Sequence, residues 1–300
     1  MPVSSPTSAA APAREADAAS ACEVTLLGFR ARVTGPAALM SSLRAVFPVP
    51  PEWASQRVPG TKTMLRVERC ADPDVSYQVT QDGALLRRID RADEVVAYIE
   101  WAINSAAVRQ IGGAYHLYHA GAVALAGRAL ILPAASGSGK TSLVAALVAS
   151  GLQYLSDEIA VVGKDTYCVL PFAKSLCVKE GARVVLAPLY PELSGGAACH
   201  RFGGERVWYL QPPAAAWPPA PVPVRYVVLP RYVAGGSTTL ARISRSTALQ
   251  QLLEQSFNAR ALGPSGVSGT VDMLRGADCY ALTVADLHQA VDLLRQLASS

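Results

Sequence analysis

The chain has 300 residues, of which 51% are hydrophobic and 17% are charged. A chain of this length and composition buries a large core, as one large domain or two modest ones, and this excludes general disorder. The formal net charge is +4, and no run of Lys or Arg marks a surface for a polyanion. We therefore expect no nucleic acid and no membrane as partner, whereas an anionic small ligand such as ATP is compatible with this charge.

The six cysteines are dispersed, with neither a C-x-x-C pair nor His neighbours at metal-binding spacing. This pattern predicts free thiols and a cytoplasmic protein. Residues 1–21 are rich in Ala, Ser and Pro, but Arg14, Glu15 and Asp17 interrupt any apolar stretch. We expect this segment to be a disordered tail rather than a signal peptide or a membrane span.

Residues 22–113 are expected to form a small α+β N-terminal domain. Alternating apolar residues predict strands over 24–33, 63–70, 75–80 and 84–89. The spacing predicts a short helix over 36–47 and a longer one over 91–110, which ends at Gly112-Gly113. Because this part of the chain has no cluster of Cys, His or carboxylate residues, we predict no chemistry for it.

Residues 114–300 are expected to form an α/β domain around a Gly-rich loop. Strands predicted over 119–125 and 128–132 lead into this loop, and a helix follows that ends at Gly151. The buried face of that helix is predicted to consist of Leu143, Val144, Leu147 and Val148. Further strands are predicted over 154–162 and 224–232, and helices over 247–257 and 284–297. The Gly- and Pro-rich segment 194–223 is expected to be a surface loop that contacts substrate or is a mere insertion.

The Gly-rich loop reads Ala134-Ala-Ser-Gly-Ser-Gly-Lys140-Thr141. A strand that enters such a loop and a helix that leaves it direct backbone N–H groups and the helix dipole at one point, which suits phosphate. Lys140 places a charge on the β and γ phosphates, and the Thr141 hydroxyl can bind Mg²⁺. Ala134 stands where the usual motif has glycine, and a Gly/Ser surface loop is the alternative interpretation. The residues predicted to bind ATP are Ser136, Gly137, Ser138, Gly139, Lys140, Thr141 and Ser142.

Several polar residues elsewhere are candidates to complete the site. Asp157 lies on a strand expected beside the loop's own strand, where a carboxylate reaches Mg²⁺ or an acceptor hydroxyl. Glu158 is expected to point to the opposite face. For His119 two interpretations stay open: a structural role, or an approach to the phosphates from the side. The candidate ligands of Mg²⁺ are Thr141, Asp157 and Glu158, and weaker candidates for contacts with phosphate or acceptor are Lys174, Lys179 and Arg206.

The order His119-Ala-Gly-Ala-Val, the loop with Lys140-Thr141, and Leu155-Ser-Asp157-Glu158 resembles the HPr kinase/phosphorylase superfamily. It is most similar to the HPr-kinase-related proteins of bacterial gene clusters. The likeness covers roughly residues 115–182 and, more weakly, Ser256-Phe-Asn258. It implies a P-loop kinase domain with a mixed, strongly twisted sheet, in which Lys140, His119 and Asp157 serve the reaction. The family has an Asp-Asp pair where this chain has Asp157-Glu158, and an acidic residue where it has Ala135.

The resemblance implies an ATP- and Mg²⁺-dependent kinase that transfers the γ-phosphoryl group to a hydroxyl. Some relatives phosphorylate a serine of a ribosomally made peptide, including lasso-peptide precursors, so a serine of a peptide or protein is the leading acceptor. No segment matches the C-terminal signature linked to phosphorolysis, so HPr itself is a less expected substrate. A kinase of a small-molecule alcohol and a nucleotide-binding switch or scaffold are the alternatives. Related enzymes are oligomers, so a homo-oligomer is compatible with the resemblance.

Overall fold

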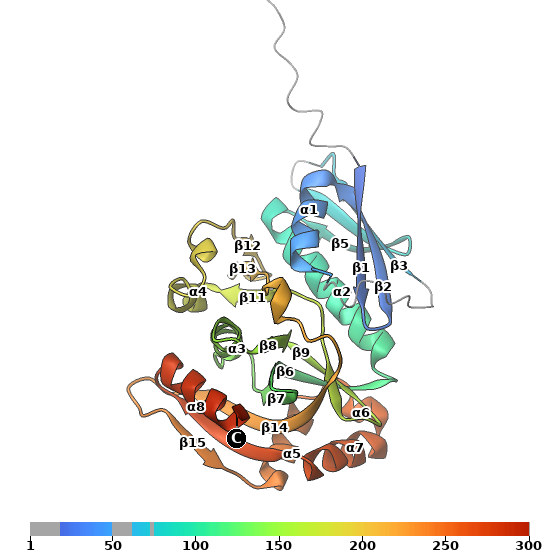
Figure 1. Cartoon of the computed structure of the whole chain (residues 1–300). Coiled ribbons are helices and arrows are strands. Elements are labelled where there is room, and N and C mark those ends of the chain that lie inside the picture. The colour runs from blue at the N-terminus through green and yellow to red at the C-terminus, as the bar shows by residue number, and fades with distance from the viewer. Residues whose placement is uncertain (1–18, 50–61, 73–74, 300) are drawn as a thin grey trace, which may run out of the picture.

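The computed structural model describes residues 19–49, 62–72 and 75–299. They form a mixed α/β structure with an N-terminal unit, blue to turquoise green in Figure 1, and a larger unit that contains the Gly-rich loop. The six cysteines all lie in these ranges and are free, as predicted. None of the helices in these ranges combines the length and the apolar character needed to cross a membrane.

The N-terminal unit is a five-stranded sheet in the order β1-β2-β3-β4-β5, with two helices packed on it. Strands β2 and β3 are parallel and the other neighbours are antiparallel. The second helix, α2, follows a single 3₁₀ turn. The elements are β1 (Ala19–Leu26), β2 (Phe29–Pro36), α1 (Ala37–Val46), β3 (Thr63–Arg69), β4 (Tyr77–Gln81), β5 (Ala84–Ile89), η3 (Ala92–Glu94) and α2 (Val95–Ile111).

The start of this unit differs from the sequence prediction. The single strand expected over 24–33 is a hairpin of β1 and β2 that turns at Leu27 and Gly28. Both turn residues have positive φ, 48° and 106°, which is the geometry of a two-residue hairpin turn. Strand β1 begins at Ala19, inside the segment expected to be a tail, and residues 1–18 lie outside the described residues.

The larger unit contains an eight-stranded mixed sheet in the order β10-β9-β6-β7-β14-β16-β15, with β8 paired to β6. Strands β7, β14 and β16 are parallel, and β6 is antiparallel to β7, β8 and β9. Because β10 pairs with both β9 and β14, the sheet curls until β10 bridges strands from its two halves. Its strands are β6 (Tyr115–Leu125), β7 (Arg128–Pro133), β8 (Gln153–Ser156), β9 (Ile159–Gly163), β10 (Cys168–Leu170), β14 (Val222–Tyr232), β15 (Thr239–Arg242) and β16 (Asp278–Val284).

A small sheet, β11-β13-β12, and several helices complete this unit. These elements are α3 (Lys140–Ala149), β11 (Leu176–Lys179), α4 (Glu180–Leu186), η4 (Pro191–Ser194), β12 (Cys199–His200), β13 (Arg206–Leu210), η5 (Ala214–Ala216), α5 (Arg245–Glu254), α6 (Ala259–Leu262), α7 (Pro264–Arg275) and α8 (Leu287–Ser299). The expected surface loop over 194–223 is therefore wrong in part, because β13 lies within it and buries Trp208 and Leu210. The expectation of only two helices after residue 247 missed α6, α7 and strand β16.

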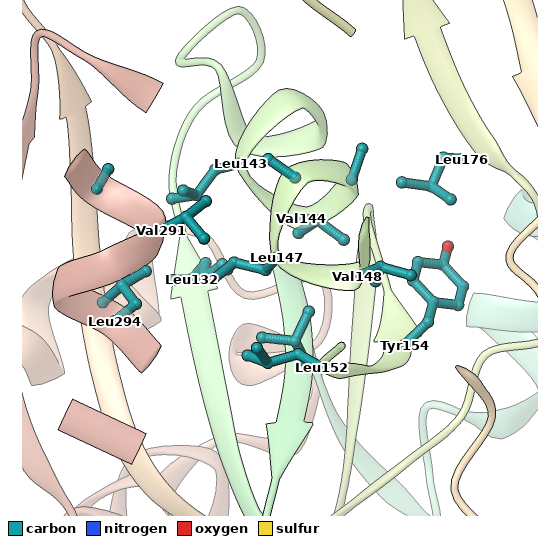
Figure 2. Close-up of a cluster of buried hydrophobic side chains, with 14 of the residues drawn as sticks. Leu132, Leu143, Val144, Leu147, Val148, Leu152, Tyr154, Leu176, Val291 and Leu294 are labelled. Atoms are coloured by element: carbon teal, nitrogen blue, oxygen red, sulfur yellow. The ribbon is translucent and has the colours of Figure 1, made fainter. Parts of the chain in front are cut away.

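Helix α3 anchors the Gly-rich loop in the core. All four of its predicted core residues are buried. Figure 2 shows Leu143 and Leu147 on the side of α8, and Val148 on the side of Tyr154. Gly151 has a φ of 100° just after the helix, as predicted for a helix stop. Helix α3 is thus held by apolar contacts on two sides, and the loop enters this anchored helix.

The two units share one continuous core. Leu117, Ile159 and Phe172 of the larger unit pack in the same cluster as the buried face of α2. The Ser175 backbone N–H donates to the Val46 carbonyl oxygen over 2.8 Å. Any change in the packing of α2 therefore reaches the β6 and β9 strands directly.

Candidate functional site

A cavity of about 580 Å³ opens beside the Gly-rich loop, just beyond the C-terminal end of β7. It brings together residues that are up to 113 positions apart in the chain, as from His119 to Tyr232. Of the sequence-predicted site residues, only Ser138 and Lys174 do not line it. Those that do are His119, Ser136, Gly137, Gly139, Lys140, Thr141, Ser142, Asp157, Glu158, Lys179 and Arg206.

The loop has the backbone geometry of a phosphate cradle. Gly137 and Gly139 both have a φ of 84°, a conformation that a residue without a side chain adopts without strain. Gly139 precedes α3, and its carbonyl oxygen accepts the Leu143 N–H over 3.0 Å. Ala134 is not among the residues with positive φ. Alanine is therefore sterically acceptable in the position where the usual motif has glycine.

Lys140 is buried and faces its own loop. Its Nζ donates to the Ala134 carbonyl oxygen over 2.8 Å and lies 3.3 Å from His119 Nε2. Burial lowers the pKa of Lys140, and the nearby carboxylates of Asp157 and Glu158 oppose this shift. The ammonium thus lies at the cavity wall, held by His119 and by the Ala134 and Ala135 carbonyl oxygens of its own loop.

His119 has a defined arrangement of its ring nitrogens. Its Nδ1 lies 3.3 Å from Gln255 Oε1, and that amide oxygen can only accept a hydrogen bond. Nδ1 therefore carries the hydrogen, and Nε2 presents its lone pair toward Lys140. Burial, assisted by the charge of Lys140, lowers the pKa of His119 from 6.5. The imidazole is neutral at pH 7 and can accept a proton. The sequence did not indicate Gln255.

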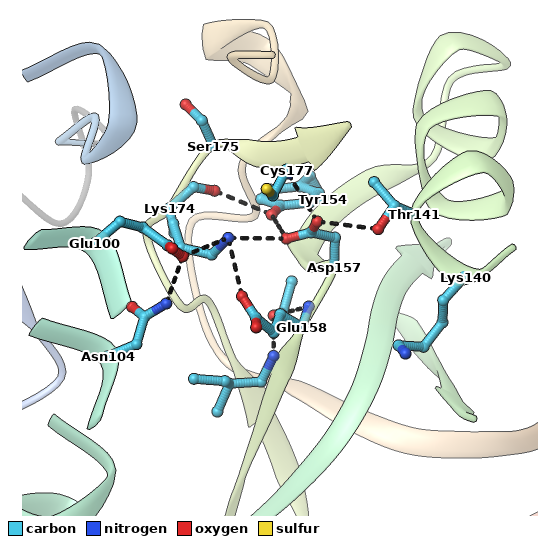
Figure 3. A network of polar contacts seen from close by, with 12 residues as sticks. Glu100, Asn104, Lys140, Thr141, Tyr154, Asp157, Glu158, Lys174, Ser175 and Cys177 are labelled. Carbon is cyan, nitrogen blue, oxygen red and sulfur yellow. Dashed lines mark hydrogen bonds and ion pairs between the residues drawn. The ribbon is translucent and has the colours of Figure 1, made fainter. Parts of the chain in front are cut away.

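The Asp157 carboxylate contacts three neighbouring side-chain and backbone groups in the cavity (Figure 3). Its Oδ2 accepts the Cys177 backbone N–H over 3.0 Å and the Thr141 hydroxyl over 3.3 Å. Its Oδ1 lies 3.1 Å from the Tyr154 hydroxyl. Groups from three elements, α3, β8 and β11, therefore hold this buried side chain against the first turn of α3.

The pair formed by Thr141 and Asp157 fits a magnesium ion. A hydroxyl and a carboxylate lie within hydrogen-bond distance of each other at the start of α3, and both are ligands that Mg²⁺ accepts. Within the described ranges, no three His, Cys, Asp or Glu side chains cluster as a metal cage. A nucleotide-bound Mg²⁺ does not need one, because phosphates and waters supply most of its ligands.

Alternation along a strand predicted that Glu158 points away from Asp157, and this prediction is wrong. The strand expected over 154–162 is broken into β8 and β9, and the two carboxylates lie in the break. The Ser156 hydroxyl accepts the N–H groups of Glu158 and Ile159 over 3.2 Å and 2.9 Å. This local turn replaces the extended backbone, so both acidic side chains line the same cavity.

The sequence suggested Lys174 as a ligand for phosphate or acceptor. The structure instead buries this side chain behind the cavity, which it does not line. Its Nζ lies 3.3 Å from Glu100, 3.2 Å from Glu158 and 3.6 Å from Asp157 (Figure 3). Burial opposes the charge, but the three carboxylates raise the pKa of Lys174 well above its usual value. For Glu158, the charges of Lys174 and Arg201 outweigh burial and lower the pKa. Lys174 is thus the counter-ion that holds the acidic residues in place.

The N-terminal unit contributes to the site, contrary to the sequence prediction. Glu100 of α2 is buried. Its Oε1 accepts a hydrogen bond from Asn104 Nδ2 over 2.6 Å, and its Oε2 lies 3.6 Å from Arg201. Burial raises the pKa of Glu100, and the charge of Lys174 opposes this shift. The signal in the sequence was a lone carboxylate within the apolar run of a helix, next to Ile99. Arg201 carried no such signal.

Lys179 and Arg206 lie at the rim of the cavity. Lys179 Nζ lies 2.9 Å from Glu205 and 3.4 Å from the Ser136 hydroxyl of the loop. Arg206 pairs with Glu180 over 2.9 Å. Both side chains are partly exposed, so they can turn toward an anionic ligand. Residues 201 and 204–206 of the segment 194–223 thus border the cavity.

No protein-family model matches the chain, and a comparison with curated proteins found no match either.

Proposed function

We propose that the protein is an ATP-dependent kinase that transfers the γ-phosphoryl group to a hydroxyl, in the first place a serine of a peptide or protein. The observation that carries this proposal is the hydrogen bond between Thr141 of the phosphate loop and Asp157, in one cavity with neutral His119. The resemblance of the same three segments to the HPr kinase superfamily supports it. A P-loop domain of that type, with a small domain before it, is part of the proposal.

The loop binds the triphosphate in this proposal. Backbone N–H groups around Gly137 and Gly139 and the start of α3 face the phosphates, and Lys140 moves from the Ala134 carbonyl oxygen to the β and γ phosphates. Thr141 and Asp157 would hold Mg²⁺, with Glu158 as a further candidate ligand. When bound, Mg²⁺ neutralises charge that develops on the phosphate oxygens.

The chemical step is an in-line transfer. The acceptor oxygen forms a bond to the γ phosphorus, the bond from that phosphorus to the β–γ bridging oxygen breaks, and ADP leaves. The hydroxyl proton passes to the Asp157 carboxylate or to Nε2 of His119, whose lone pair becomes available once Lys140 has moved to the phosphates. Positioning by the loop and by the fixed Asp157 side chain supplies most of the rate.

The test is incubation with γ-labelled ATP and two sets of acceptors, serine-containing peptides and free alcohols. Lys140→Ala should lower transfer about 10²–10³-fold while the protein stays folded, and Lys164→Ala, at a partly exposed lysine outside the cavity, should not. Transfer by folded Lys140→Ala at the normal rate would contradict the proposal. Asp157→Asn and His119→Gln, measured separately, show which group takes the proton.

Transfer only to free alcohols would instead support a small-molecule kinase, which the same cavity allows because the phosphate machinery does not specify the acceptor. Nucleotide binding without any transfer would support a switch or scaffold. Both results would contradict a peptide or protein serine as the acceptor.

A further inference from the structure

A second cavity, a groove of about 880 Å³, adjoins the phosphate cavity. Glu158, Arg201 and Glu205 line both, so the two cavities are continuous. Helix α2 of the N-terminal unit supplies residues along the groove, and the segment with Phe202 supplies others. A ligand in this groove would thus reach the carboxylate end of the phosphate cavity.

Exposed aromatic rings gather in this groove. Trp101 is 59% exposed, Phe202 51% and Phe257 46%, and all three line it. Every other Trp or Phe that the structure describes is buried. Leu86, also exposed, adds to the same apolar surface. Exposed apolar side chains that cluster beside a polar site mark a binding surface.

Two of these rings are held by their neighbours. The Trp101 ring centroid lies 5.7 Å from that of Tyr98, and Phe202 meets Tyr98 edge-on at 5.9 Å. The Arg87 guanidinium lies 4.2 Å from the centre of the Phe202 ring. The rings are therefore ordered before any ligand binds, which reduces the entropy lost on association.

The third ring, Phe257, lies at the catalytic end of the groove. Its centroid is 5.9 Å from that of His119. The Phe257 backbone N–H donates to the Leu117 carbonyl oxygen over 2.9 Å. Asn258 fixes the next residue, because its Oδ1 accepts the Leu117 N–H and its Nδ2 donates to the Tyr115 carbonyl oxygen. A ligand that contacts Phe257 is thus beside the proposed proton acceptor.

The charges that the groove shares with the phosphate cavity are compensated within the protein. Arg201 lies 3.6 Å from Glu100, and Glu205 lies 2.9 Å from Lys179. Such pairs leave little net attraction for a strongly charged ligand. The groove therefore offers mainly aromatic surface, which suits an apolar peptide segment.

We propose that this groove binds the acceptor as an extended peptide segment with aromatic or large aliphatic residues beside its hydroxyl residue. One such residue packs on Phe257, and another packs between Trp101 and Phe202. The hydroxyl then reaches the phosphate cavity past Glu158. This inference rests on the proposed function, because it names the acceptor class of the same site.

Binding is tested apart from catalysis. Two labelled synthetic peptides, each with one central serine, carry either Phe or Ala on both sides of it. Their dissociation constants are measured by fluorescence anisotropy with Mg²⁺ and a non-hydrolysable ATP analogue present. The Phe peptide should bind at least about tenfold more tightly, the effect of one well-packed aromatic contact. Equal affinities would overturn the proposal.

Variants locate the bound peptide. Trp101→Ala and Phe257→Ala should each weaken the Phe peptide about tenfold and leave nucleotide affinity unchanged. Leu86→Ala should weaken it less, and Leu85→Ala is the matched control, because Leu85 is the exposed neighbour on β5 that does not line the groove. Unchanged peptide affinity in both aromatic variants would overturn the proposal, as would full competition by 2-phenylethanol, which would indicate a small-molecule occupant.

Label transfer from γ-labelled ATP, measured on the same peptides, separates this inference from the proposed function. A Phe peptide that binds through Trp101 and Phe257 but is never phosphorylated contradicts the kinase and supports the groove. Phosphorylation without any preference for Phe contradicts the groove and supports the kinase.

Discussion

Lys174 Nζ lies 3.3 Å from Glu100 Oε1, and this buried ion pair joins the N-terminal unit to the acidic residues of the phosphate cavity. The same ammonium group lies 3.2 Å from Glu158. Helix α2 thus takes part in positioning a carboxylate that lines both the cavity and the groove. The N-terminal unit is part of the site and not an accessory to it.

Lys174→Met should destabilise the protein by about 3–5 kcal/mol, because it leaves three carboxylates without their shared counter-ion. The free energy of unfolding in urea measures this. Lys179→Met, at a partly exposed lysine, should change it by no more than about 0.5 kcal/mol. Glu100→Gln should cost less than Lys174→Met, since Asp157 and Glu158 still neutralise the ammonium. Equal free energies of unfolding for Lys174→Met and Lys179→Met would contradict the role of Lys174 as the shared counter-ion.

His119 should give phosphoryl transfer a characteristic pH dependence. Burial and the charge of Lys140 lower its pKa below 6.5, so the neutral ring that accepts a proton is present from pH 6.5 upward. We expect kcat to be flat there and to fall as the pH decreases through the lowered pKa. His119→Gln should be slower and lack this low-pH decline. A decline of the same shape in His119→Gln would assign it to another group.

Stability should depend on the same titration with a definite sign. Because the folded state disfavours the protonated ring, the unfolded state binds this proton first as the pH falls below 6.5. His119 therefore contributes a loss of stability below pH 6.5 and none above it. Urea unfolding across this range should show a smaller loss for His119→Gln than for the native chain.

Thr141→Val should raise the Mg²⁺ concentration needed for half-maximal nucleotide binding about tenfold or more. The reason is that it removes a proposed Mg²⁺ ligand that also orients Asp157. Thr141→Ser, which keeps the hydroxyl, should bind Mg²⁺–nucleotide nearly as well as the native chain. Titration of Mg²⁺ at constant nucleotide measures both. Equal behaviour of the valine and serine variants would exclude a role for this hydroxyl.

Gly139→Ala should destabilise the loop by about 1–2 kcal/mol, since a side chain is strained at its φ of 84°. Ala134→Gly, which restores the usual motif, should cost at most about 1 kcal/mol through the added freedom of the unfolded chain. Urea unfolding and nucleotide affinity measure both changes. If Ala134→Gly strongly raised nucleotide affinity, alanine at this position would be a real impairment of the loop.

Parts of this site were predictable because they depend on residues close together in the chain. Gly137 and Gly139 adopt the expected positive φ, and the apolar spacing of α3 places its four predicted residues in the core. Asp157 was found because it directly follows β8, the first strand after α3. Local conformational preference and helical periodicity are enough for such features.

Other parts failed where a local contact or a distant partner overrode the pattern. Strand alternation put Glu158 on the wrong face, because the Ser156 hydroxyl breaks the strand there. Lys174 seemed free to bind a ligand, but two units bury it among carboxylates. Periodicity cannot identify partners that come from distant elements.

The sequence by itself determined the Gly-rich loop, its positive-φ glycines and the helix that follows, because backbone sterics and apolar spacing act over a few residues. Only the tertiary structure decided that Thr141 contacts Asp157 and that Glu100 of the N-terminal unit pairs with Lys174. It also placed Trp101 and Phe257 in one groove beside the loop. These relationships depend on how β6, α2 and the segment after α5 pack together, and burial in a common core is what sets that packing.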